Sequence, residues 1–324
     1  MPRNWFWWGL ALIAGWLLLE RRTKRSDGEL VENLPPYRRM LAYAMPGRNE
    51  SVVYFDRAVR AEKLEAYLEQ AKDKLGANMT HATVAAVLGA FGDNPRMNQF
   101  VAGRRLYRRK GVWVTFSMKR QKLNRKAYLA AVKLDLREGE TFRELVDRIN
   151  AKVGEERSGK KTAADKEFDI LNLLPRPFLR SAVGLIRVLD YYGLVPSWFI
   201  QGDGMFTSMF VANLGSVGMG PGYHHLYEYG TCPLFLMIGK VEDRVIVEDG
   251  KPVAARILPL RFSFDERIDD GHNANYGIEA IVTRLEDPFG WLGCLADDGS
   301  DVLPIWPHGK HVDQGDQSEY KPPA

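Results

Sequence analysis

The sequence predicts an α/β fold, and three observations carry that prediction. Segments with apolar residues at every second position, such as 258–264, alternate along the chain with segments of helical apolar spacing, such as 62–75. Hydrophobic residues make up 45% of the 324 residues and charged residues 27%, which is typical of a globular protein with a sizeable core. No internal repeat is visible, so we expect one large folded domain and not an array.

Composition limits the classes of function. The net charge of +4 is too small to indicate nucleic-acid binding. Cys232 and Cys294 make neither a disulfide framework nor a metal set, which favours a reducing compartment. The adjacent pair His224 and His225 lacks the helical spacing of a zinc site, so no metal is expected.

Residues 1–25 contain an apolar run from Trp5 to Leu19, which we interpret as a membrane anchor. As a helix the run reaches roughly 22 Å, so flanking residues must help it to cross a hydrocarbon core of ~30 Å. A cleaved signal peptide is the alternative, but no small-x-small cleavage site follows the run. Basic residues follow it and predict a cytoplasmic location for the rest of the chain: Arg21, Arg22, Lys24 and Arg25. Residues 26–36 are polar with two prolines and are predicted to be a linker.

The first half of the folded part, from residue 37, follows a strand–helix–helix–strand–strand order. Thr141 and Glu144 form a capping box at the start of one helix. The predicted elements are a strand at 51–59, helices at 62–75 and 80–92, a hairpin of strands at 100–107 and 112–118, a strand at 130–136 and a helix at 141–153.

The segment 168–200 is strongly apolar but carries Arg176, Arg180 and Arg187 at intervals. Such a segment fits an ordinary core helix. It equally fits a helix in the membrane interface, with its apolar side in the lipid and its arginines at the headgroups. Both interpretations stay open at this point.

The second half returns to strands and ends in a helix. A strand and turn are predicted at 205–218 and a buried strand at 234–239, followed by a hairpin at 244–257 around Glu248-Asp249-Gly250. The strand 258–264 then leads into a helix at 274–285. Residues 292–324 are polar, acidic and rich in proline, and we predict a largely unstructured tail.

The run at 265–271, Asp-Glu-Arg-Ile-Asp-Asp-Gly, joins that last strand to the last helix. By pattern alone it is a salt-bridged helix start. It also resembles a motif of the chloramphenicol acetyltransferase-like fold, above all the acyltransferase component of 2-oxoacid dehydrogenase complexes. That motif reads Asp-His-Arg-x-x-Asp-Gly, and its helix closes with Leu-Glu-Asp-Pro, which 285–288 match. Asp265, Arg267, Asp270 and Gly271 match the motif, whereas the catalytic histidine of the family falls on Glu266.

A second motif supports the resemblance. Residues 205–218 resemble the family's Phe-Thr-Ile-Ser-Asn-Leu-Gly, with Asn213 matching and the oxyanion-stabilising hydroxyl falling on Ala212. The resemblance covers about 37–288, contains 168–200 as an insertion, and lacks the family's lipoyl and partner-binding domains. It implies a two-layer α/β sandwich with a mixed sheet, within a domain of 37–291. It also implies a homotrimer with the active site between subunits.

Acyl transfer needs a base for the acceptor proton and donors aimed at the developing oxyanion. Glu266 is the first candidate for the base. The Asn213 amide is a candidate to replace the missing hydroxyl, although closing a turn is its ordinary role. His225 (or His224) is a candidate to enter the site from a neighbouring strand, although such a pair next to aromatic residues ordinarily has a structural role. By resemblance, Arg267 and Asp270 hold the loop through ion pairs, with Arg38 or Arg39 as a partner, and Gly271 is a structural residue of the same loop.

The expected ligand is an acyl thioester, with coenzyme A as a co-substrate that is not covalently bound. Arg104, Arg105 and Arg108 form a basic cluster that fits the phosphates of coenzyme A. A solvated face, or one against anionic lipid, is the favoured interpretation because no glycine-rich phosphate loop accompanies them. The sequence therefore predicts a membrane-anchored acyltransferase-like protein with an unknown acceptor. The alternative is a non-catalytic trimeric scaffold that retains the fold.

Overall fold

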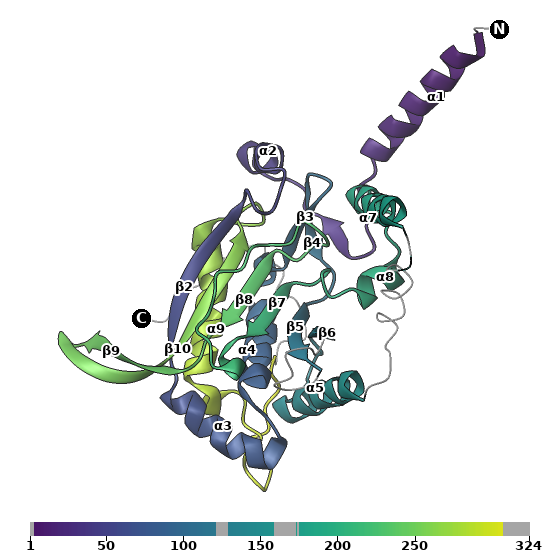
Figure 1. Cartoon of the computed structure of the whole chain (residues 1–324). Helices are drawn as coiled ribbons and strands as arrows, with labels where there is room; N and C mark the ends of the chain where they lie inside the picture. Colours follow the sequence, from purple (N-terminus) through teal and green to yellow (C-terminus); the bar gives the residue numbers. More distant parts are fainter. Residues whose placement is uncertain (1–2, 121–128, 159–172, 174, 307–324) are drawn as a thin grey trace.

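The computed structural model describes residues 3–120, 129–158, 173 and 175–306. A seven-stranded sheet organises the chain, in the order β2-β10-β8-β7-β5-β6, with β9 paired to the first half of β10 (Figure 1). Its strands are β2 (Val52–Arg60), β5 (Trp113–Lys119), β6 (Leu129–Asp135), β7 (Met209–Asn213), β8 (Leu234–Ile238), β9 (Glu242–Glu248) and β10 (Lys251–Asp265).

The sheet is mixed, because β7 runs parallel to both β5 and β8 while the other pairs are antiparallel. Four helices contact it from one face, as Figure 1 shows for α4 and α9 behind the strands. They are α3 (Glu62–Leu75), α4 (Met79–Asp93), α5 (Phe142–Arg157) and α9 (Gly271–Glu286), with single 3-10 turns at Pro95–Met97, Gly215–Val217 and Pro288–Gly290. The predicted two-layer α/β sandwich is confirmed.

Strand β8 shows why the sheet needs cover on both faces, since all five of its residues are buried. Leu234, Leu236 and Ile238 enter the main core beneath the helices, whereas Phe235 and Met237 enter a second apolar cluster on the other face. A central strand of this kind lacks polar alternation because neither face meets water. Helix α4 is likewise buried around most of its circumference, which is expected of a central helix.

Local signals fix the ends of several helices where the sequence predicts them. Thr141 and Glu144 form the predicted capping box at the start of α5. Gly76 adopts a left-handed conformation (φ 69°) and closes α3. The hairpin between β9 and β10 turns at Asp249 and Gly250, both with positive φ, as the Asp-Gly pair predicts.

The predicted hairpin of strands 100–107 and 112–118 is wrong. The first segment is itself a hairpin, β3 (Gln99–Ala102) with β4 (Arg105–Arg109), which turns at Gly103 and Arg104, with φ of 55° and 58°. A turn with two left-handed residues matches the twist of paired strands, and a glycine supplies one of them. β3 and β4 belong to a separate three-stranded sheet, whereas β5 pairs within the large sheet.

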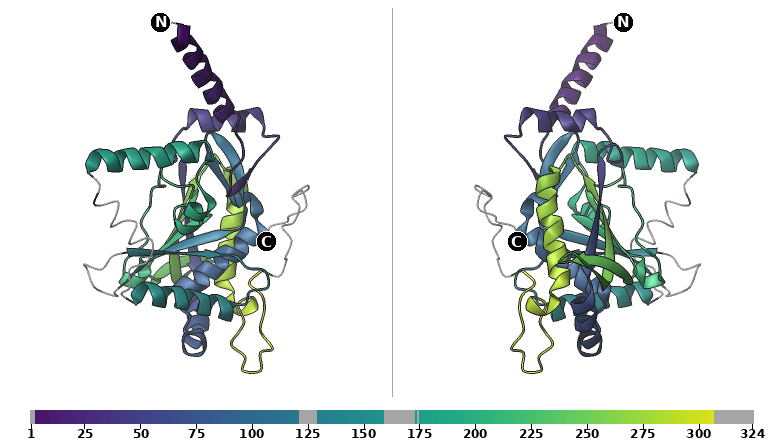
Figure 2. Two further views of the ribbon diagram at one scale, coloured as in Figure 1. Left: turned by 90° about the vertical axis from the view of Figure 1, so that its right-hand side faces the viewer. Right: turned by 90° about the vertical axis from the view of Figure 1, so that its left-hand side faces the viewer.

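Two N-terminal expectations need correction. Residues 26–36 are not a simple linker, because β1 (Gly28–Leu30) pairs with β4 and completes the small sheet. The apolar run forms α1 (Arg3–Glu20), which projects from the body (Figure 2). Among the described residues, no helix combines the length and the apolar character needed to cross a membrane, so the predicted transmembrane helix is not supported. The 18 residues of α1 include polar positions at both ends.

The insertion folds as two helices, α7 (Arg176–Tyr191) and α8 (Ser197–Gly202); residues 168–172 and 174 lie outside the described ones. α7 has no buried residue, so it is not the core helix that one interpretation predicted. Its C-terminal end is held by Asp190, whose carboxylate lies 2.7 Å from the guanidinium of the buried Arg25. Arg25, assigned by sequence to the basic flank of the anchor, is therefore part of the folded body.

Residues 292–306 are not the unstructured tail that composition predicted. Leu292, Cys294 and Ile305 are buried in the main core, and the Ile305 amide donates to the carbonyl oxygen of Glu140. These few apolar residues are separated by polar and glycine residues, which explains why composition concealed them. The predicted tail at 307–324 and the basic residues at 122–126 lie outside the described residues. At the N-terminal edge of the fold, α2 (Pro36–Ala44) precedes β2.

Candidate functional site

The loop that follows β10 is organised by a buried ion pair between Asp265 and Arg267. Arg267 donates twice to the Asp265 carboxylate, from Nε to Oδ1 at 2.8 Å and from Nη2 to Oδ2 at 2.7 Å. The Ser51 hydroxyl donates to the same Oδ1 at 2.9 Å. Nη1 of Arg267 donates to the carbonyl oxygens of Met45 and Pro46 after α2. The pair therefore joins the end of β10 to the chain entering β2.

Asp269 and Asp270 connect the same loop to α9 and α2. The Asp270 side chain caps α9 by accepting from the amide of Asn273 at 2.9 Å, with Gly271 as the first helical residue. Nη1 of Arg38 lies 3.5 Å from Asp269 and 3.9 Å from Asp270, so Arg38 stands where the sequence suggested an ion-pair partner. The matched motif residues thus hold the loop in place.

Glu266 is held in the loop by its backbone, while its side chain has no hydrogen-bond or ion-pair partner among the described residues. Its amide donates to the carbonyl oxygen of Ser51 at 3.0 Å, and the residue is half-buried. Within the described part of the chain, its carboxylate accepts no hydrogen bond and joins no ion pair, unlike those of Asp265, Asp269 and Asp270. Of the four acids in the loop it is therefore the one available to a ligand.

The second motif lies at the end of β7. Ala212 is half-buried and offers only a methyl group where a hydroxyl was expected. The Asn213 amide donates from Nδ2 to the Thr80 hydroxyl at 3.1 Å, and its Oδ1 accepts from the Ser216 amide at 3.0 Å. Asn213 therefore closes the turn after β7 against the start of α4, and one of its two amide hydrogens is already used.

These two motifs lie at opposite ends of the sheet within one chain. Asn213 is paired with Ile238 of β8, which in turn is paired with Leu260 of β10. Glu266 follows Leu260 by six residues, which corresponds to about 20 Å along an extended strand. A single copy of the chain therefore cannot bring Glu266 and Asn213 to the same reacting atoms.

His224 and His225 lie over the face of the sheet opposite the helices. The His224 ring stacks on Phe235 with centroids 4.3 Å apart, and the His225 ring stacks on His224 at 4.9 Å. Nδ1 of His225 lies 3.0 Å from the carbonyl oxygen of Leu226, so this nitrogen carries the proton. Among the residues described, neither ring contacts Glu266, and stacking is the role that the geometry supports.

The three arginines that the sequence assigned to coenzyme A have different surroundings and do not form one cluster. Arg104 faces a pocket beside α7, Arg105 donates to the carbonyl oxygen of Glu20 at the base of α1, and Arg108 is exposed opposite Glu29. Alternate residues of a strand point to opposite faces, which explains why sequence neighbours separate. The described residues contain no group of three or more His, Cys, Asp or Glu side chains that could hold a metal ion.

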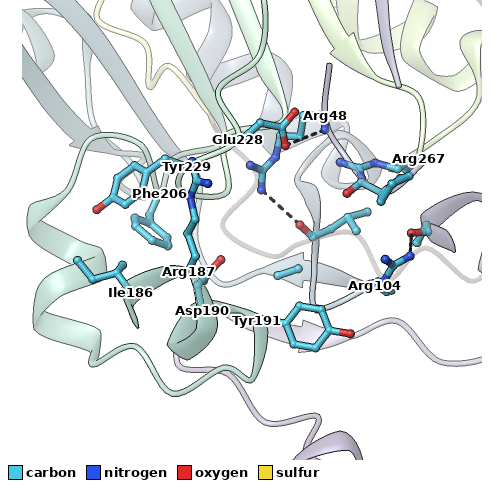
Figure 3. A pocket seen from close by; sticks show the side chains of 16 residues that line it. Arg48, Arg104, Ile186, Arg187, Asp190, Tyr191, Phe206, Glu228, Tyr229 and Arg267 are labelled. Carbon is cyan, nitrogen blue, oxygen red and sulfur yellow. Dashed lines mark hydrogen bonds between the residues drawn. The ribbon is translucent and has the colours of Figure 1, made fainter. Parts of the chain in front are cut away.

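The pocket that Arg104 faces has a volume of about 420 Å³ and was not predicted (Figure 3). Arg48, Arg187 and Arg267 line it from three other parts of the chain. Arg187 was noted in the insertion, but no sequence signal links it to Arg48.

Comparison with known proteins agrees with this architecture. Residues 203–292 match the family model of the 2-oxoacid dehydrogenases acyltransferase (catalytic domain). A Bacillus subtilis protein, the dihydrolipoyllysine-residue acetyltransferase component of the pyruvate dehydrogenase complex, is 36% identical over 82 residues. That match covers 25% of this chain and only 18% of the length of the relative.

Solved structures extend the similarity of fold to most of the chain. A probable dihydrolipoamide acetyltransferase from Listeria monocytogenes superposes with a TM-score of 0.53 at 16% identity, covering 80% of this chain and 95% of the other. The cubic core of a pyruvate dehydrogenase multienzyme complex gives 0.51 at 19% identity, covering 80% and 92%. The resemblance to the acyltransferase fold is confirmed, and the matched residues include both motifs.

Proposed function

We propose that the chain binds an acyl thioester and transfers its acyl group, with the Glu266 carboxylate as the base. The observation that carries the proposal is the uncommitted carboxylate of Glu266, in a loop held by the buried pair of Asp265 and Arg267. By the resemblance of the motif, this residue falls where the family has its catalytic histidine. The match of residues 203–292 to an acyltransferase catalytic domain supports this class of reaction.

A complete site would need a second copy of the chain. Glu266 and the turn at Asn213 lie about 20 Å apart along the sheet, so both can border one ligand only if different copies supply them. We therefore propose a homotrimer, as the sequence resemblance implies. One structural neighbour, described as a cubic core, is itself a multi-copy assembly.

The chemistry is expected to be slow compared with a histidine-based site. Ordinary pKa values of ~4.3 for Glu and ~6.5 for His differ by ~2, which makes proton uptake less favourable by roughly 3 kcal/mol. Ala212 supplies no oxyanion donor, and such a donor is worth about 3 kcal/mol. The second amide hydrogen of Asn213, which the contact with Thr80 does not use, is a candidate replacement for that donor.

A non-catalytic scaffold is the second candidate. The missing hydroxyl at Ala212 and the use of Asn213 in the turn favour it. In this case the fold would persist for assembly or ligand binding, and Glu266 would have no acid–base role.

Turnover by the full chain separates the two candidates. Release of free coenzyme A from acetyl- and longer acyl-coenzyme A is followed with a thiol reagent and a panel of amine, alcohol and thiol acceptors. Glu266→Gln removes the base and is expected to lower kcat at least about tenfold with little change in KM. Glu69→Gln, an exposed residue of α3, is the matched control and should leave both constants unchanged.

Glu266→His adds a second criterion. If the site is a degenerate acyltransferase site, the imidazole should raise kcat and shift the pH profile toward the pKa of histidine. Equal rates for the wild type and Glu266→Gln would instead support the scaffold. Coenzyme A as the acyl carrier and the cytoplasmic location stay predictions.

A further inference from the structure

A pocket lies between the insertion helix α7 and the body of the protein, beside the small sheet. α7 contributes Ile186 and Arg187, while Val101, Arg104 and Phe206 line it from the body. Its volume of about 420 Å³ is within the range of small-molecule sites. Figure 3 shows the side chain of Arg187 extending from α7 toward Tyr229 and Arg48, which line the same pocket.

Arg48 is a buried cation without a carboxylate of its own. It is only 5% exposed; its Nη1 donates to the carbonyl oxygen of Tyr227 at 2.9 Å and its Nη2 to that of Val101 at 3.4 Å, while its Nε has no hydrogen-bond partner. The nearby Asp265 is occupied by both branches of Arg267. Burial lowers the pKa of Arg48, because a guanidinium removed from water loses its hydration. An anion in the pocket would offset that cost.

The two acidic residues of the lining, Asp190 and Glu228, do not cancel the positive charge of its arginines. The Asp190 carboxylate pairs with Arg25, and that of Glu228 accepts the backbone amides of Arg48 and Asn49. In the described parts of the chain, neither Arg104 nor Arg187 has a carboxylate within ion-pair distance. The guanidinium groups of Arg48, Arg104 and Arg187 therefore outnumber the one lining carboxylate without an ion-pair partner, that of Glu228, and leave a net excess of two positive charges.

We propose that this pocket binds a phosphorylated ligand, with the phosphate between Arg48 and Arg187 and Arg104 at its edge. A phosphate monoester carries close to two negative charges at neutral pH, whereas a carboxylate carries one, so the phosphate matches the uncompensated charge better. The forked donors of arginine suit its oxygens. Val101, Ile186 and Phe206 provide apolar walls for the uncharged part of the ligand. The inference does not depend on acyl transfer, because none of these residues takes part in the proposed reaction.

Binding is tested with full-length protein and defined probes. Inorganic phosphate and glycerol 3-phosphate represent soluble phosphates and are titrated by calorimetry and by thermal unfolding. Phosphatidylcholine vesicles with and without phosphatidic acid represent a lipid headgroup and are tested by co-sedimentation. Arg187→Gln is the main variant, because Arg187 is exposed and its loss should not unfold the chain. Arg180→Gln, on the same helix but outside this pocket, is the matched control.

We expect Arg187→Gln to weaken binding of the phosphate probe about tenfold or more, and Arg180→Gln to leave it unchanged. Arg48→Lys, which keeps the charge but not the fork, should weaken binding without loss of folding. Binding of soluble phosphates with this pattern supports a soluble ligand, and binding of phosphatidic acid alone with this pattern supports a lipid headgroup. Absence of binding to all probes, or equal losses in Arg187→Gln and Arg180→Gln, overturns the proposal.

Discussion

Replacing Asp265 with asparagine tests whether the buried ion pair holds the loop after β10. Asp265 is fully buried, and its carboxylate accepts two hydrogen bonds from the Arg267 side chain and one from Ser51. The isosteric amide removes the negative charge and turns one acceptor into a donor that faces Nη2 of Arg267. Removing one partner of a buried pair costs about 3–5 kcal/mol, because the remaining charge stays buried and unpaired. That loss is a large fraction of the ~5–15 kcal/mol that stabilise a typical domain.

Urea denaturation of the full chain measures the loss. With a slope of about 3 kcal/mol per molar, suited to a large domain, the midpoint should fall by about 1–2 M. Asp56→Asn is the control: Asp56 lies 2.8 Å from Arg261 but its side chain is 51% exposed, so about 1 kcal/mol or less is expected. Adding Arg267→Met to Asp265→Asn should recover part of the loss. A cost below about 1 kcal/mol, or one equal to that of Asp56→Asn, would refute the reasoning.

Two further predictions concern a half-buried lysine and a buried glycine. Burial, reinforced by the charge of Arg109, lowers the pKa of Lys133 to about 7, and its ammonium donates to the carbonyl oxygens of Ile200 and Asp203. Between that value and the unfolded pKa of ~10.4 the unfolded chain binds more protons, so wild-type stability should rise with pH relative to Lys133→Met. Urea unfolding at pH 6 and 9.5 should show a difference on the order of 1–3 kcal/mol, and parallel curves would contradict the lowered pKa. A Cβ at Gly277 would overlap the side chain of the buried Met97, so Gly277→Ala should lower the melting temperature despite a helix-propensity gain of about 1 kcal/mol. Gly184→Ala in α7 meets no atom within 4 Å and should maintain or raise it; equal effects would exclude the steric argument.

Much of the fold was predictable because local chemistry decides it. The capping box of Thr141 and Glu144 satisfies amides within one turn, and the Asp249-Gly250 turn supplies the left-handed residues that its hairpin needs. Such signals act between near neighbours, so the sequence alone contains them. The motif at 265–271, which contains Glu266, was likewise visible in the sequence.

The errors arose where pairing between distant segments decides the structure. Pairing with β4, which also pairs with β1, makes 99–102 part of a small sheet, although its sequence also suits the large one. Ile305 is buried because the chain returns to α5, and its polar surroundings in the sequence gave no indication of this. The predicted membrane anchor is a different case: α1 has an apolar composition, but among the described residues no helix has both the length and the apolar character needed to cross a membrane.

For the candidate sites too, some features follow from the sequence alone and others only from the tertiary structure. The sequence by itself determined that Glu266 falls where the motif it resembles has a histidine, since that comparison needs only the residues of one loop. Only the tertiary structure decided that Glu266 and Asn213 lie at opposite ends of the sheet, because strand register sets distances that residue spacing does not contain. It also gathered Arg48, Arg104 and Arg187 around one pocket. These three come from separate segments, and only the packing of α7 on the body places their charges together.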